Sequence, residues 1–252
     1  MMRNQRRVAF SAMIALGIVA GLASPASALF STIQGRDPGA TPTGPRPLSN
    51  AAAAAFDAAV APLGPGGLIT FETSPVGGFT SRVVAPGVTA SFTNALPTSG
   101  ISSSSSNITG FNTTPGGSRF LQFSPVTSST VRNASTNFAF AGPIQAFGTY
   151  ITGLGTATGS LFAVFNDGTN ETVPILGGLN GGVQFFGLID STRSIASISF
   201  QLTSANGNLA DVIGFDDVRY VPVPEPSSIA LAGVGLVGLI GLGARARRTK
   251  AD

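Results

Sequence analysis

The side chains best suited to chemistry in this chain of 252 residues are four acids, Glu72, Asp211, Asp216 and Asp217. Two carboxylates can act as acid and base in glycoside cleavage. However, Asp216 and Asp217 are neighbours on a predicted strand, where successive side chains point to opposite faces. Carboxylate oxygens are also the ligands that Ca²⁺ prefers, so binding of a structural calcium ion is favoured over catalysis for these acids. The alternative is that these acids are solvated or paired with nearby arginines.

Other residue types needed for catalysis are missing from the sequence. There is no His, which removes the usual general base and any Ser-His-Asp triad, and no Cys, which removes disulfides and thiolate metal sites. The pattern G-x-G-x-x-G at Gly233–Gly238 has no βαβ unit around it and is not interpreted as a nucleotide site. We therefore predict no catalytic residues, and a polysaccharide hydrolase is the least favoured alternative.

The basic charge of the chain lies at its two ends. The formal net charge is +3, but Leu29–Val223 holds seven arginines against nine acids, which gives 7 − 9 = −2. A basic surface of the kind that binds nucleic acid is therefore not expected.

These acids must be positioned by strands. From Leu68 onward the apolar residues alternate with polar ones, and turn signals such as Asn166–Gly168 and Asn180–Gly182 separate the segments. About ten strands within residues 68–221, among them Leu68–Thr73, Asn137–Ala141 and Ala146–Thr152, predict an all-β, jelly-roll-like β-sandwich ectodomain. Phenylalanines are expected to supply its core: Phe71, Phe120, Phe123, Phe138, Phe140, Phe147, Phe162, Phe165, Phe185, Phe186, Phe200 and Phe215.

Residues 29–67 precede this domain and are rich in Pro and Gly. We interpret them as a flexible lead-in with one short helix, Ala51–Val60. Five consecutive alanines favour that helix, and Ser49 or Asn50 can cap it.

The N-terminus has the three parts of a signal peptide. Arg3, Arg6 and Arg7 are followed by the apolar segment Val8–Ala23 and the small-residue motif Ala26-Ser27-Ala28. Residues 1–28 are therefore expected to direct the chain to the secretory translocon and then to be removed by signal peptidase. Arg6-Arg7 keeps the twin-arginine route open as an alternative.

Residues 222–252 form a second signal. Pro224-Glu225-Pro226 precedes an apolar segment, Ile229–Ala244, and a basic end with Arg245, Arg247 and Arg248. A helix needs roughly 20 apolar residues to cross a bilayer, and the basic end favours the cytoplasmic side. We expect a single transmembrane helix here.

This order of motif, span and basic end resembles the PEP-CTERM sorting signal of bacterial exported proteins. The resemblance implies recognition and processing by an exosortase, a membrane-embedded cysteine transpeptidase. An ordinary C-terminal membrane anchor is the alternative.

The ectodomain is similar to those of other PEP-CTERM proteins in its opening residues, Leu68–Glu72, and its closing ones, Phe185–Asp190, Ile195–Phe200 and Asp211–Val218. Those domains are in turn similar to lectin-like jelly rolls. We expect a non-enzymatic exported protein, anchored transiently in the membrane and then delivered to the cell surface or extracellular matrix. The alternative is a module that binds exopolysaccharide.

Overall fold

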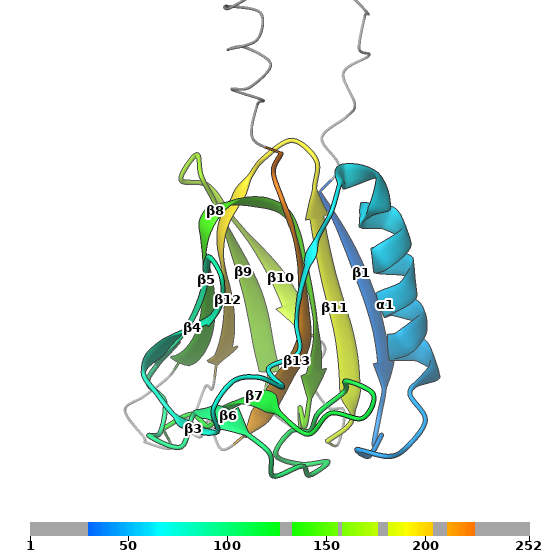
Figure 1. The fold of residues 1–252 in the computed structure, drawn as a ribbon, viewed down its shortest axis with the longest axis vertical. Helices are drawn as coiled ribbons and strands as arrows, with labels where there is room; N and C mark the ends of the chain where they lie inside the picture. Colours follow the sequence, from blue (N-terminus) through cyan, green and yellow to red (C-terminus); the bar gives the residue numbers. More distant parts are fainter. Residues whose placement is uncertain (1–29, 127–132, 156–157, 176–180, 204–210, 225–252) are drawn as a thin grey trace, which may run out of the picture.

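The computed structural model describes residues 30–126, 133–155, 158–175, 181–203 and 211–224 (Figure 1). The strands are β1 (Phe30–Asp37), β2 (Gly67–Ile69), β3 (Gly77–Gly78), β4 (Ser81–Ala85), β5 (Val88–Thr93), β6 (Gly100–Ser102), β7 (Phe120–Phe123), β8 (Asn133–Thr152), β9 (Thr158–Phe165), β10 (Asn170–Ile175), β11 (Val183–Asp190), β12 (Ile195–Thr203) and β13 (Ile213–Pro222). The helices in this part of the chain are α1 (Pro47–Val60) and the short η1 (Ala61–Leu63).

The strands form a β-sandwich whose two layers share one long strand, β8. The first half of β8 pairs with β5 and β12, and its second half pairs with β11 and β13. One layer is therefore β10-β9-β12-β8-β5-β4, and the other is β1-β11-β8-β13. β2 and β7 pair with opposite ends of β13. Figure 1 shows β8 bending from one layer into the other.

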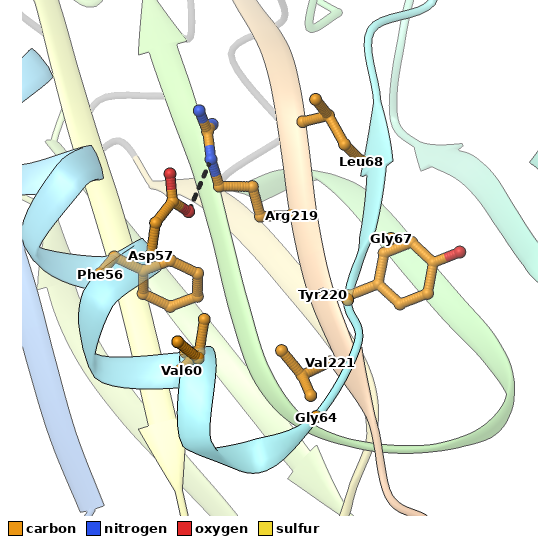
Figure 2. A pocket seen from close by; sticks show the side chains of 11 residues that line it. Phe56, Asp57, Val60, Gly64, Gly67, Leu68, Arg219, Tyr220 and Val221 are labelled. Atoms are coloured by element: carbon orange, nitrogen blue, oxygen red, sulfur yellow. Dashed lines mark ion pairs between the residues drawn. The ribbon is translucent and has the colours of Figure 1, made fainter.

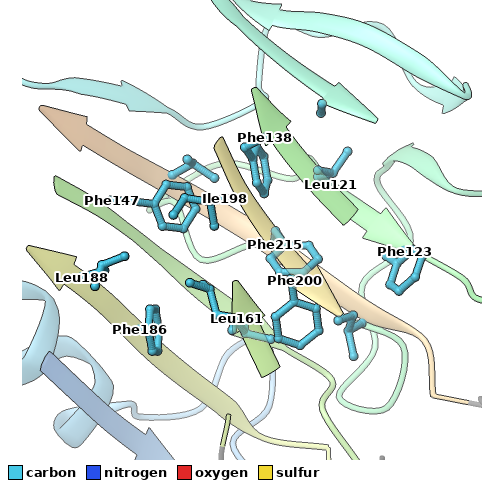
Figure 3. Packing of buried hydrophobic residues seen from close by; sticks show 14 of the residues in the cluster. Leu121, Phe123, Phe138, Phe147, Leu161, Phe186, Leu188, Ile198, Phe200 and Phe215 are labelled. Carbon is cyan, nitrogen blue, oxygen red and sulfur yellow. The ribbon is translucent and has the colours of Figure 1, made fainter. Parts of the chain in front are cut away.

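Phenylalanine side chains fill the space between the two layers. Phe138 lies 5.6 Å from Phe147 and 6.0 Å from Phe215, measured between ring centroids, and Phe200 lies 5.1 Å from Phe215 (Figure 3). These rings come from β8, β12 and β13, so the core joins strands that are far apart in sequence. Such offset and edge-to-face pairs stabilise a core beyond the burial of their area.

The helix α1 covers the outer face of the layer that contains β1 and β11. Its buried residues, Ser49, Ala52, Ala53, Phe56 and Val60, recur at helical spacing. Asp37, at the end of β1, accepts hydrogen bonds from Leu48 N at 3.1 Å and Ser49 N at 2.8 Å. This carboxylate satisfies two N–H groups of the first turn, which have no partner within a helix.

Both ends of the described chain leave the sandwich at the same pole (Figure 1). The register explains this: Phe30 pairs with Asp190, Ile189 pairs with Ala146, and Ala146 pairs with Val221. The start of β1 and the end of β13 therefore lie in one row across neighbouring strands.

The all-β prediction is confirmed, and the predicted helix is found with a start four residues earlier, at Pro47. Ser49 does not cap it, because the N-cap is Arg46 and the Ser49 hydroxyl donates to Asp37 instead. The predicted flexible lead-in is corrected, because its residues Phe30–Asp37 form β1. That strand was missed because its alternation is weak and only its pairing with β11 defines it.

Two further strand predictions are corrected. Asn137–Ala141 and Ala146–Thr152 were expected as separate strands but belong to the single strand β8. The strand expected at Leu68–Thr73 ends at Ile69. Ten of the twelve predicted core phenylalanines are fully buried, whereas Phe140 and Phe162 are partly exposed.

Within the described residues, no helix is both long and apolar enough to cross a membrane. The predicted signal peptide with Ala26 and Ala28 lies outside the described residues. So do Glu225, Pro226, the apolar segment and the basic end with Arg245, Arg247 and Arg248.

Candidate functional site

The acids Asp216 and Asp217 lie at a β-bulge in the middle of β13. Asp216 pairs with Tyr150 and Arg219 pairs with Gly148, so the two residues between them face the single residue Thr149 of β8. Asp217 has a φ of 47°, in the left-handed region that few residues other than Gly adopt. The expectation that the two side chains point to opposite faces is therefore wrong here.

The bulge aims both carboxylates at the same two threonines. Thr113 N donates to Asp216 Oδ2 at 2.6 Å, and Thr113 Oγ1 lies 3.0 Å from Asp216 Oδ2 and 3.1 Å from Asp217 Oδ2. Thr114 Oγ1 lies 2.6 Å from Asp217 Oδ1. The pair thus fastens the loop before β7 to the last strand.

Burial makes the ionisation of this pair unusual. Asp216 has no exposed surface, and its Oδ1 has no hydrogen-bond partner among the described residues. Desolvation, together with the negative charge of Asp217, raises the pKa of Asp216 from 3.8 to about 7. A proton on Asp216 removes the repulsion between the two carboxylates.

Glu72 follows β2 and binds a different part of the same loop. Its Oε1 accepts hydrogen bonds from Asn112 Nδ2 at 2.6 Å and from Arg119 N at 3.0 Å, and Ser118 N donates to Oε2 at 3.0 Å. These donors are the protein's own, so the carboxylate stabilises the turn that leads into β7.

Asp211 lies before β13, where its Oδ2 accepts a hydrogen bond from Gly155 N at 2.8 Å. Across the described ranges, no three acids come close enough together to hold a metal ion. Glu72, Asp211, Asp216 and Asp217 therefore do not form one cluster. Calcium binding by a smaller set stays a prediction.

Among the hollows on the surface of the described residues, two have aromatic side chains in their lining. The first, of about 310 Å³, lies between the end of α1 and the strands β2 and β13 (Figure 2). Arg219 Nε and Asp57 Oδ1 form an ion pair of 3.1 Å across it. Arg219 also donates to Asp217 O at 2.8 Å, so its guanidinium is held by the fold.

The second hollow, of about 580 Å³, lies beside β5. Phe79, which is partly exposed, and Phe92 line it with ring centroids 5.2 Å apart, and Thr80 and Asn94 add a hydroxyl and an amide. Arg82 lies over the ring of Phe79 at 4.5 Å. No motif marks this set in the sequence, because its members come from separate turns and strands.

The structure describes the chain as far as Pro224, the first residue of the predicted sorting tripeptide. Val223 N donates a hydrogen bond of 2.9 Å to Pro143 O, and Pro224 follows with an exposed side chain. No linker separates β13 from the motif.

Residues 222–248 match the family model of the PEP-CTERM protein-sorting motif. The chain therefore carries this motif at its C-terminal end. No curated protein matches the chain.

Among solved structures, the chain is similar to a mutant of the CBM29-2 carbohydrate-binding module, with a TM-score of 0.39 and 11% identity. It is also similar to a mutant of this module complexed with mannohexaose, with a TM-score of 0.40 and 10% identity. Each alignment covers 62% of this chain, and 84% and 90% of the solved chains respectively. These similarities do not identify a ligand for this chain.

Proposed function

We propose that this chain is an exported, non-enzymatic surface or extracellular-matrix protein that an exosortase sorts and processes through its C-terminal tail. The signal peptide of residues 1–28 directs export, and residues 229–244 anchor the precursor in the membrane. Residues 68–221, a jelly-roll-like sandwich, with β1 and α1 packed on it, remain outside the cell as the functional domain.

The observation that carries this proposal is the sorting motif at residues 222–248. It begins at Pro222, the last residue of β13, so the folded domain and the processing signal share a single residue. The apolar segment that follows contains no charge and ends at Arg245, Arg247 and Arg248, as expected for a membrane span with a cytoplasmic basic end.

Replacing Pro224, Glu225 and Pro226 with alanine tests the proposal. We expect the membrane-bound precursor to accumulate and the released form to be lost, measured by immunoblotting of membranes and medium and by intact mass. The matched control replaces Ser227 and Ser228, which lie outside the tripeptide. Unchanged maturation of the triple variant would show that the tail is an ordinary anchor.

A second candidate function is binding of exopolysaccharide in the hollow beside β5. An aromatic wall with a few polar groups is the usual composition of a small-molecule site, and Phe79, Thr80 and Asn94 supply it. Saturable binding of one glycan to residues 29–223, weakened by Phe79→Ala and unaffected by Leu68→Ala, would support this candidate. Leu68 is an exposed apolar residue of the other hollow.

A further inference from the structure

The sorting motif is attached to the folded domain at a fixed point. β13 pairs with β8 as far as Pro222, and the hydrogen bond from Val223 N to Pro143 O ties down the next residue. Extended chain spans at most about 3.6 Å per residue. An enzyme that grips Glu225, two residues further on, must therefore come within about 7 Å of Val223.

The surface at this point, which we name the tail pole, consists of the bend Ala141–Pro143 in β8 and the turns Pro86–Gly87 and Pro62–Gly66. Ala141 N donates to Gly87 O at 2.8 Å, which joins the bend to the first turn. A Cβ added at Gly66 would lie 2.9 Å from Tyr220 O, which places the second turn against the end of β13.

The tail pole has a distinctive composition. Its residues are Pro, Gly and Ala apart from Leu63, and none is charged, whereas the charged residues Asp190 and Arg193 lie farther along the same row, beside the start of β1. Ala141, Gly142 and Pro143 are all exposed. Small and rigid residues let a second protein approach the backbone closely, and they lose little side-chain entropy when covered.

We propose that the tail pole is a contact surface for the membrane-embedded transpeptidase that processes the tail. This inference rests on the proposed function, because it concerns the partner of the same sorting motif. Since no linker separates β13 from Pro224, the enzyme cannot hold the motif without approaching the bend at Ala141–Pro143. The opposite pole, with Thr43 in the loop between β1 and α1, stays away from the enzyme.

Gly142 is the best position for a test. A Cβ there meets nothing within 4 Å, and its φ is not in the left-handed region, so a large side chain is compatible with the fold. We would compare full-length chains with Gly142→Tyr, with the control Thr43→Tyr, and with a Gly-Ser linker of about ten residues between Val223 and Pro224. The linker would also be combined with Gly142→Tyr, and Ala141→Tyr would serve as a second bulky variant.

Processing is followed by pulse-chase conversion of precursor to product. We expect Gly142→Tyr to slow conversion at least fivefold with an unchanged melting temperature, and Thr43→Tyr to have no effect. The linker should abolish the effect of Gly142→Tyr. If the linker chain alone is processed normally but the linker does not restore conversion of Gly142→Tyr, the result counts against the contact. Wild-type conversion by both bulky variants would overturn it.

A photo-crosslinking residue at position 142 identifies what the tail pole touches. An adduct with the transpeptidase supports the proposal, whereas adducts with lipid alone would assign this pole to the bilayer and overturn it. The alanine variant of Pro224, Glu225 and Pro226 distinguishes the two hypotheses. If it matures normally, the proposed function itself fails, whereas a defect there with no effect at Gly142 removes the contact alone.

Discussion

The carboxylates of Asp216 and Asp217 both lie within hydrogen-bonding distance of one hydroxyl, Thr113 Oγ1, at 3.0 and 3.1 Å. A hydroxyl carries a single proton, so it cannot donate to both acids at once. A proton on Asp216 supplies the missing hydrogen-bond donor and removes the repulsion between the two negative charges. A protonated Asp216 therefore leaves the Thr113 hydroxyl free to donate to Asp217.

The stability of the domain should depend on this proton. The pKa of Asp216 is raised from 3.8 to about 7, so between these values the folded state keeps a proton that the unfolded state has lost. The contribution of Asp216 to the free energy of unfolding is fullest below pH 4 and is lost as pH rises toward 7, by on the order of 4 kcal/mol. Urea titrations at pH 4.5, 6 and 8 measure it.

Asp216→Asn is the variant that isolates this effect, because it imitates the protonated acid. The stability of the wild type relative to this variant should fall as pH rises from 4.5 to 8. The comparison cancels the pH dependence of other acids such as Asp190. Burial raises the pKa of Asp190, but its hydrogen bonds to the backbone and side chains of Thr192 and Arg193 lower it overall, so its contribution is lost only as pH falls below about 4. A difference that does not vary with pH would refute the shared proton.

Calcium is the second test, and it follows from the sequence prediction. If the acids around Asp216 bind Ca²⁺, melts of residues 29–223 in excess calcium should exceed those in chelator by several degrees, since an ion that binds only the folded state stabilises it. Asp217→Asn should remove that difference, and Asp167→Asn, which changes an exposed turn acid, should not. Coincident wild-type melts would show that Thr113 and Thr114 satisfy these acids without an ion.

The attachment of α1 depends on Asp37. Its carboxylate is buried and accepts from Leu48 N, Ser49 N and Ser49 Oγ. Asp37→Ala leaves these donors unpaired and should cost about 2–3 kcal/mol of unfolding free energy. The matched control is Asp57→Ala on the same helix. It breaks an ion pair whose acid is 54% exposed and should cost less than about 1 kcal/mol. Equal losses of unfolding free energy in the two variants would contradict the conclusion that the hydrogen bonds of Asp37 hold the start of α1.

The packing of α1 on the sheet requires a glycine in β11. A Cβ at Gly187 would lie 2.5 Å from Phe56 Cδ2, so Gly187→Ala should destabilise the domain by about 1–3 kcal/mol. Combining it with Phe56→Leu should recover part of that loss. Gly142→Ala is the control, because a Cβ there meets nothing within 4 Å. Denaturant unfolding of the wild type, Gly187→Ala, Phe56→Leu and the double variant gives the coupling energy directly.

The sequence by itself determined the all-β class, the helix over Ala51–Val60 and the sorting motif at the C-terminal end. These depend on local properties: period-two alternation, a run of alanines, and charge placed before or after an apolar segment. The order of Pro224, Glu225 and Pro226 before Ile229–Ala244 identified the sorting motif without any tertiary information.

Only the tertiary structure decided how the acids are used. The bulge that turns Asp217 toward Asp216 arises because two residues of β13 face Thr149 alone, and no local pattern encodes that register. Likewise, β1 becomes a strand only because β11 offers it a partner, and Val223 meets Pro143 only because β8 bends between the two layers. Contacts between residues distant in sequence depend on the packing of the whole chain, which is why periodicity and motif spacing did not reveal them.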